Sequence, residues 1–168
     1  IEVLATCSHD TGAAVAAVPA DRDQWAYLSS GTWSLIGVEL PEPIINDAAR
    51  DLNFTNEIGH GNTVRLLRNI IGLWLVQECR REWAEAGEHY DYATLAQLAA
   101  DAKPFAALID PSDERFFKPE SMIAAITEFC RETSQTAPTS PGALIRCALE
   151  SLALLYRQRL NEVSALSG

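Results

Sequence analysis

The spacing of apolar residues divides the chain into a first part with the period of strands and a later part with the period of helices. Residues 25–40, WAYLSSGTWSLIGVEL, form two aromatic and β-branched runs on either side of the small polar residues 29–32. This composition is typical of a β-hairpin, and we expect Gly31 to take a positive φ in its turn. Residues 53–67 predict one or two further strands with turns at glycines. Residues 1–5 fit a short strand.

Helical periodicity dominates from residue 68 onwards. The pattern predicts five helices, at residues 10–18, 68–86, 92–102, 119–133 and from Pro141 onwards, and a loop at residues 41–53. The last helix is the best defined, because Ser140 can cap it and Pro141 fits its first turn. Strands followed by helices favour a mixed α/β domain whose sheet is covered by helices.

The composition suits a single domain. The 168 residues are 48% apolar and 21% charged, values that are close to those of globular proteins. A formal net charge of −10 leaves no broad basic surface for a phosphate backbone, which argues against nucleic acid as a partner. The longest apolar stretch, residues 70–76, is far short of the ~20 residues that a membrane-spanning helix needs. We expect a cytoplasmic protein.

The four cysteines are scattered along the chain, at positions 7, 79, 130 and 147. A structural zinc site needs close pairs of cysteines or histidines, and Cys7-x-His9 alone is a weak signal. We therefore assign no residue to a metal and expect the cysteines to be mostly small buried side chains.

Asp10 precedes a run of small apolar residues in CSHDTGAAVAAVP, residues 7–19. As a cap, its carboxylate would accept hydrogen bonds from the free N–H groups of the first helical turn. As a general base, it would take a proton from a substrate hydroxyl while its neighbours His9 and Thr11 bind that substrate. The two roles are compatible at one position.

Two further groups of polar residues allow chemistry. The turn at residues 29–32 is either a plain connection or a loop that holds a phosphate, since Gly31 permits close approach of an anion and Thr32 can donate to a phosphoryl oxygen. Asn69 and Gln77 would lie within a quarter turn of each other on the predicted helix. They are either a cap and a solvent-facing residue, or two amides that point into a cleft.

A family resemblance rests on four segments taken together, which are CSHDTGAAVAAVP, YLSSGTWSLIGVEL, NFTNEIGHGNTVRLLRNIIGLWLVQECRREW and PGALIRCALESLALLYR. In order and approximate spacing they resemble the C-terminal half of the FGGY family of carbohydrate kinases. The resemblance implies the actin-like ATPase fold, which has two ribonuclease-H-like domains. For the intact parent protein it implies phosphorylation of a ketose with ATP and Mg²⁺, with L-rhamnulose, at its 1-hydroxyl, as the expected substrate.

The resemblance also implies roles for residues on the sugar side of the reaction. By matching position, Asp10 resembles the proton acceptor of the family, and His9 and Thr11 resemble flanking substrate contacts. Asn69 matches an asparagine that contacts the substrate. The general base is therefore the role we expect for Asp10.

On the nucleotide side, the resemblance points to the turn and to one amide. Thr32 matches a threonine that contacts the ATP phosphates, with Gly31 beside it, and Gln77 matches a glutamine that contacts ATP. The resemblance also aligns Cys130 and Cys147 with a pair that relatives can bridge. A disulfide is the exception in a cytosolic protein, and the sequence alone does not decide whether Cys130 and Cys147 are bridged.

By this resemblance residues 1–168 make up most of the C-terminal domain, without the N-terminal domain and the final adenine-binding segment. We therefore expect the fragment alone to be inactive, and to associate with the missing N-terminal part or with itself. One alternative is another FGGY sugar kinase, of the fuculokinase or xylulokinase type. The other is a noncatalytic module that binds a nucleotide or a sugar.

Overall fold

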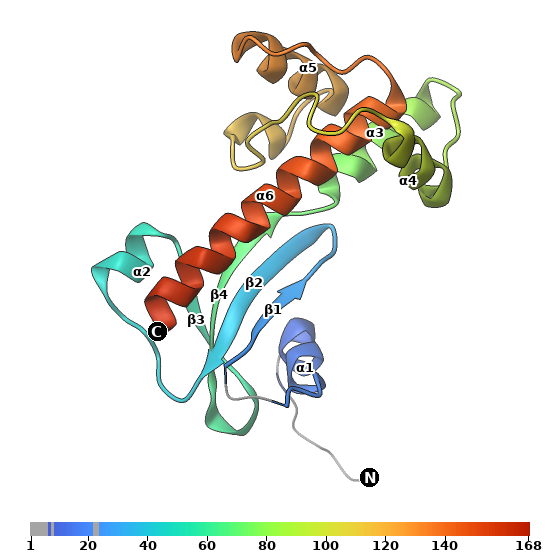
Figure 1. Cartoon of the computed structure of the whole chain (residues 1–168). Coiled ribbons are helices and arrows are strands. Elements are labelled where there is room, and N and C mark those ends of the chain that lie inside the picture. The colour runs from blue at the N-terminus through green and yellow to red at the C-terminus, as the bar shows by residue number, and fades with distance from the viewer. Residues whose placement is uncertain (1–6, 8, 22–23) are drawn as a thin grey trace, which may run out of the picture. The chain divides into compact units, whose positions relative to one another are not determined.

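The computed structural model describes residues 7, 9–21 and 24–168, which form two compact units (Figure 1). Unit 1 takes in residues 1–30, 34–70 and 157–168, and unit 2 takes in residues 31–33 and 71–156. The strand predicted at residues 1–5 lies outside the described residues. The mixed α/β class that the sequence predicts is confirmed.

Unit 1 is built on a four-stranded sheet with the order β1-β2-β4-β3. The strands are β1 (Ala26–Ser29), β2 (Trp33–Leu40), β3 (Thr55–Ile58) and β4 (Val64–Ile71). β1 and β2 form the predicted antiparallel hairpin, and β3 pairs antiparallel with β4. A 3₁₀ turn, η1 (His60–Asn62), joins β3 to β4 and contains Gly61 at φ 65°.

The two faces of this sheet are covered by different helices, as Figure 1 shows. Val15 of α1 (Asp10–Ala16) packs against Tyr27 and Leu67. Val163, near the end of α6 (Pro141–Ser167), packs against Val38 and Leu66 on the other face. We call these the α1 face and the α6 face. They follow from strand geometry, because neighbouring residues such as Leu66 and Leu67 point to opposite sides of a sheet.

A short helix, α2 (Asp47–Asp51), replaces the loop that was predicted at residues 41–53. Asn46 caps it, since its side-chain oxygen accepts a 2.8 Å hydrogen bond from the N–H of Ala49. Ala49 and Phe54 bury themselves with Leu66 on the α6 face. Burial of these two apolar side chains therefore stabilises a helix too short to persist alone.

Unit 2 is helical. It contains α3 (Trp74–Glu85), α4 (Tyr92–Asp101), the 3₁₀ turn η2 (Glu114–Phe116), α5 (Met122–Glu132) and the part of α6 up to residue 156. Its core holds side chains that are almost completely buried, among them Leu75, Cys79, Leu95, Phe116, Met122, Ile126, Ile145 and Ala148. The predicted cap of α6 is confirmed, because Ser140 Oγ accepts a hydrogen bond from the N–H of Ala143 at 3.3 Å.

The helix predicted at residues 68–86 is wrong in its first part. Residues 68–71 continue strand β4, and the helix begins only at Trp74, after Gly72. Asn69 and Gln77 therefore do not share a helix. None of the helices in the described part of the chain is long and apolar enough to cross a lipid bilayer.

Candidate functional site

Asp10 is the first residue of α1, and its carboxylate faces solvent. The side chain is 95% exposed. Its Oδ1 accepts a 2.7 Å hydrogen bond from the N–H of Thr11, and His9 Nδ1 lies 3.2 Å from the same oxygen. His9 occupies the N-cap position but makes no side-chain capping bond. The Asp10 carboxylate thus satisfies one N–H of the first turn through Oδ1, and no described residue forms a hydrogen bond with its other oxygen.

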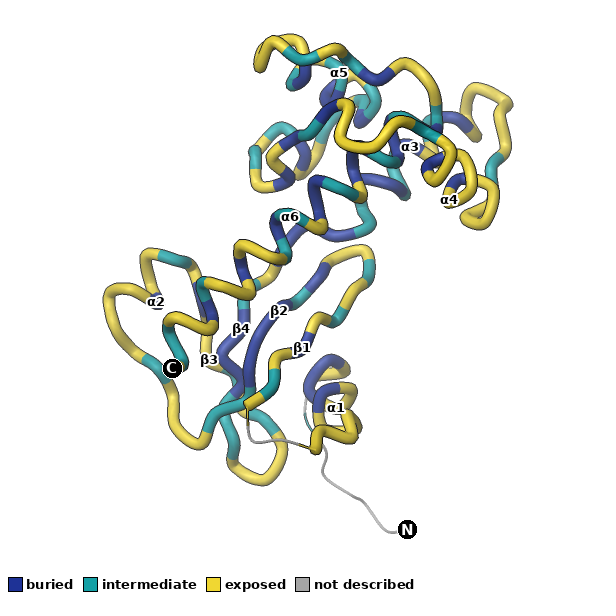
Figure 2. The backbone as a smooth tube through the Cα atoms, viewed as in Figure 1, coloured by how far each residue is buried: buried dark blue, intermediate teal, exposed yellow. Residues whose placement is uncertain are grey.

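Thr11 is turned the other way. Thr11 is only 8% exposed, and it is buried together with Gly12 and Val15, whereas other parts of α1 are exposed (Figure 2). The Thr11 hydroxyl reaches Asp10 Oδ1 only at 3.4 Å, the outer limit of a hydrogen bond. Among these three neighbours, therefore, Thr11 is buried and His9 and Asp10 are the exposed groups.

Asn69 lies on β4 and is exposed. Since side chains alternate along a strand, Asn69 falls on the same face as Leu67, which packs against Val15 of α1. Unit 1 therefore brings Asn69 and the helix that carries Asp10 to the same side of the sheet. The prediction that Asn69 caps a helix is wrong, because the backbone there is extended and pairs within the sheet.

Gly31, Thr32 and Gln77 gather at the start of α3 in unit 2. The carbonyl of Gly31 accepts a 2.8 Å hydrogen bond from the N–H of Leu73, and the carbonyl of Thr32 accepts from Gly72 and Trp74, each at 3.1 Å. The N–H of Gln77 in turn donates to the carbonyl of Leu73 at 2.9 Å. The turn between β1 and β2 is thus joined to the beginning of α3 by backbone hydrogen bonds.

The expectation that Gly31 takes a positive φ in the turn is wrong, because Gly31 is not among the described glycines at positive φ. The hydrogen bond from the Leu73 N–H orients the Gly31 carbonyl, so the hairpin alone does not determine the backbone conformation there. The Thr32 side chain remains exposed. Leu73, the N-cap residue of α3, makes no side-chain capping bond.

Sequence reasoning missed a buried polar group on the α1 face. Arg65 of β4 is 1% exposed and pairs with its cross-strand neighbour Glu57, with Nη2 and Oε2 2.7 Å apart. The Tyr27 hydroxyl lies beside the guanidinium. Burial raises the pKa of Tyr27 to about 12, although the nearby Arg65 charge acts in the opposite direction. The signal that could have found this pair is the opposite charge of Glu57 and Arg65, which lie at matching positions on the two sides of the turn between β3 and β4.

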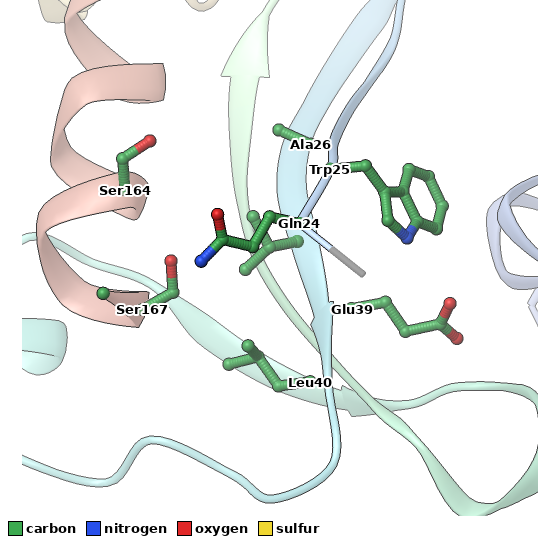
Figure 3. A pocket seen from close by; sticks show the side chains of 9 residues that line it. Gln24, Trp25, Ala26, Glu39, Leu40, Ser164 and Ser167 are labelled. Carbon is green, nitrogen blue, oxygen red and sulfur yellow. The ribbon is translucent and has the colours of Figure 1, made fainter. Parts of the chain in front are cut away.

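A hollow of about 320 Å³ lies in unit 1, beside the last turns of α6 (Figure 3). Its walls are Gln24, Trp25, Ala26, Val38, Glu39, Leu40, Ser164, Ser167 and Gly168. Figure 3 shows Trp25 and Glu39 on the opposite side of the sheet from Ser164 and Ser167. The hollow therefore lies beside β1, which is an outer strand of the described sheet, and none of the predicted site residues lines it.

All four cysteines are free thiols. Burial raises the pKa of Cys79 and of Cys147 to about 12, so these two are protonated and poor nucleophiles at neutral pH. Burial also raises the pKa of Cys130. Within the described residues no group of three or more His, Cys, Asp or Glu side chains is arranged to hold a metal ion.

Comparison with known proteins gives one consistent result. Residues 26–168 match the C-terminal domain of the FGGY family of carbohydrate kinases. The chain is 50% identical to a rhamnulokinase of Bacteroides thetaiotaomicron over 99% of its own length and 34% of that protein. It is 45% identical to the rhamnulokinase of Enterococcus faecalis, over 99% of this chain and 33% of that protein.

A solved structure, xylulose kinase from Bifidobacterium adolescentis, is similar with a TM-score of 0.48 and 19% identity, over 84% of this chain and 26% of that one. The chain spans about a third of the length of the curated relatives that it matches. The family model covers most of the chain, and the relatives align with nearly all of it. The chain therefore belongs to the FGGY family of carbohydrate kinases.

Proposed function

We propose that the chain supplies most of the C-terminal domain of a rhamnulokinase. The parent protein would transfer the γ-phosphoryl group of ATP to the 1-hydroxyl of L-rhamnulose and would act in the cytoplasm. The observation that carries the proposal is the 50% identity to a rhamnulokinase along 99% of this chain.

In this proposal Asp10 is the general base. It takes the proton of the sugar hydroxyl as the oxygen bonds to the γ-phosphorus and ADP leaves. The exposed carboxylate, 95% open to solvent, supports the role, since a base must reach the proton that it abstracts. His9 beside it and Asn69 on the same side of the sheet would bind the sugar. Thr11, which is buried, would act through its backbone.

Unit 2 would supply the contacts to ATP. The exposed Thr32 hydroxyl would donate to a phosphate oxygen, and Gly31 leaves space beside it. Gln77, half-buried in the first turns of α3, would add an amide. Phosphoryl transfer depends mainly on such positioning and on stabilising charge.

Mg²⁺ would arrive on the nucleotide. It usually keeps several waters and is bound by substrate phosphates with one or two carboxylates. The described residues hold no preformed cluster of three metal-ligating side chains. We further propose that residues 1–168 alone do not turn over and that they associate with the N-terminal part of the parent.

The test uses the full-length parent with ATP and a panel of L-rhamnulose, L-fuculose and D-xylulose. We expect turnover to be highest with L-rhamnulose. Asp10→Asn should lower kcat by about 10³-fold with little change in sugar KM. Asp47→Asn is the matched control, because Asp47 is also an exposed aspartate in the first turn of a helix, α2, and it should leave turnover unchanged.

Two results would contradict the proposal. Preference for another ketose would indicate a different FGGY kinase. Absence of turnover on every sugar, with binding of nucleotide intact, would indicate a noncatalytic module.

A further inference from the structure

We infer that Arg65 is a positioning residue, which fixes the place of α1 on the sheet and so the place of the Asp10 carboxylate. The inference rests on the proposed function, because Asp10 matters only if it is the general base. Arg65 is buried on β4, whereas Asp10 is on α1, and both elements belong to unit 1.

The contact between α1 and Arg65 is direct. Gly12 is the third residue of α1, and a Cβ built on it would lie 3.1 Å from Arg65 Nη2 and 3.3 Å from Arg65 Cζ. It would also lie 2.9 Å from the Cβ of Cys7. The helix backbone therefore rests on the guanidinium with no side chain between them. Any shift of the guanidinium must move α1 or open a gap beneath it.

The guanidinium itself lies between residues of the two outer strands of the sheet. Glu57 on β3 pairs with it at 2.7 Å, and the two residues are direct partners in the β3–β4 register. From the other side, Tyr27 on β1 reaches across Gly37, its partner on β2, and the Arg65 charge is near enough to influence the pKa of its hydroxyl. The ion pair with Glu57 thus limits where the Arg65 guanidinium can lie, and Tyr27 fills the space towards the other edge of the sheet.

Stability alone does not account for an arginine here. In the described part of the chain, Arg65 Nε and Nη1 are buried without a hydrogen-bond partner. Buried donors that stay unpaired oppose folding. Replacing a buried ion pair by well-packed apolar side chains is often neutral or stabilising. What the guanidinium offers is a flat and rigid surface, on which a helix backbone without a Cβ can rest.

A displacement of α1 at this contact would also move the Asp10 carboxylate. It lies two residues before Gly12, in the same turn of a seven-residue helix, and a helical turn moves as a rigid body. A misplacement of about 1 Å at a reacting group can cost about 10²-fold in rate. Arg65 is therefore expected to act on the proton transfer while touching neither the sugar nor ATP.

The experiment uses the full-length parent protein and three variants. Arg65→Met removes the flat contact, Arg65→Lys keeps the charge without the planar group, and Gly12→Ala disturbs the same contact from the helix side. Arg50→Met is the control, since Arg50 on α2 is exposed and pairs only with the exposed Asp47 and Asp51. For each we measure kcat, KM for both substrates, and hydrogen exchange of the amides of α1 and of β2 and β4.

Arg65→Met should lower kcat by about 10²-fold and leave KM for ATP within about twofold, with faster exchange in α1 and unchanged exchange in β2 and β4. Arg65→Lys should recover part of kcat. Gly12→Ala should also lower kcat, even though alanine is a better helix former than glycine. Arg50→Met should behave as the wild type.

The inference is overturned if Arg65→Met keeps its kcat, or if exchange rises equally in α1 and in the sheet, which is the mark of a general structural role. Should Arg65→Met fail to fold, Gly12→Ala decides, because a folded variant with unchanged kcat also overturns it. If the wild-type parent phosphorylates no ketose, the proposed function fails on its own. In that case the exchange of α1 in Arg65→Met still supports or overturns the positioning of the helix.

Discussion

Gly37 lies directly opposite Tyr27 in the β1–β2 ladder, and the missing side chain gives the tyrosine ring its place. A Cβ built on Gly37 would lie 2.8 Å from the Tyr27 hydroxyl oxygen and 2.8 Å from the Cβ of Leu67, and closer still to the carbonyl oxygen of Leu66. This glycine is needed for close approach across the sheet rather than for an unusual φ. It lets one side chain from β1 extend over β2 to the buried charge on β4.

We expect Gly37→Ala to lower the free energy of unfolding by about 1–3 kcal/mol, the usual cost of overpacking a core. The atoms that the new methyl group meets include backbone, which cannot move aside alone. Urea unfolding measures the change. Ile58→Ala on β3 is the control, because Ile58 is 82% exposed and should shift stability by no more than about 0.5 kcal/mol. Equal effects of the two changes would contradict the close approach seen at Gly37.

Arg146 of α6 closes the end of α4. Its Nη1 donates to the carbonyls of Ala99, Ala100 and Ala102 at 2.9–3.0 Å, and its Nε donates to Glu150 at 2.8 Å. The last carbonyls of a helix lack partners within the helix. We expect Arg146→Met to destabilise the protein by about 2 kcal/mol. Arg131→Met, an exposed change on α5 in the same unit, should stay within about 0.5 kcal/mol of the wild type in the same urea titration.

Stability should fall at alkaline pH because of the buried thiols. Burial raises the pKa of Cys79 and Cys147 from 9.0 to about 12. Between these values the unfolded chain binds fewer protons than the folded one, so the free energy of unfolding decreases as pH rises. Below pH 9 both states hold these protons, and the contribution is constant. Unfolding in urea with a reductant, at pH 8 and at pH 10.5, measures the fall.

The same burial predicts the order of cysteine alkylation. Cys7 is partly exposed, and Cys79, Cys130 and Cys147 are buried. With iodoacetamide at pH 8, we expect Cys7 to react first and the other three only as the chain unfolds. Mass spectrometry of digests taken over time reads out each site. Modification of Cys79 at the rate of Cys7 would show that the unit 2 core opens readily, contrary to this expectation.

Much of the fold follows from local signals. The hairpin around residues 29–32, the short helix after Asp10, and the capped helix from Pro141 are all confirmed. The wrong helix start at residue 68 has a physical reason. In the run VRLLRNII, residues 64–71, the apolar pairs 66/70 and 67/71 fit a helix as well as a strand. Pairing with distant strands decided the outcome, and no local pattern contains that information.

The candidate site was predictable in its residue types but only partly in its geometry. The exposed Asp10 at a helix start follows from small residues after an acidic one, and the structure adds the bond to Thr11. The link between Gly31 and Leu73 joins residues 42 positions apart by backbone groups alone, which side-chain patterns do not encode. The burial of Arg65 depends on its register with Glu57. Sequence analysis could name that charge but not its burial.

The role of the Thr32 hydroxyl can be tested with substitutions that remove or keep this one group. Thr32→Val removes the donor and keeps the shape, whereas Thr32→Ser keeps the donor, and the backbone carbonyl that binds Gly72 and Trp74 stays in both. In the full-length parent we expect Thr32→Val to lower kcat/KM for ATP by about 10–10²-fold, the loss of a hydrogen bond to a charged group. Thr32→Ser should retain most of it, and sugar KM should change little in either. Steady-state kinetics with varied ATP at saturating L-rhamnulose measures the difference, and equal losses in the two variants would assign Thr32 a packing role instead of a phosphate contact.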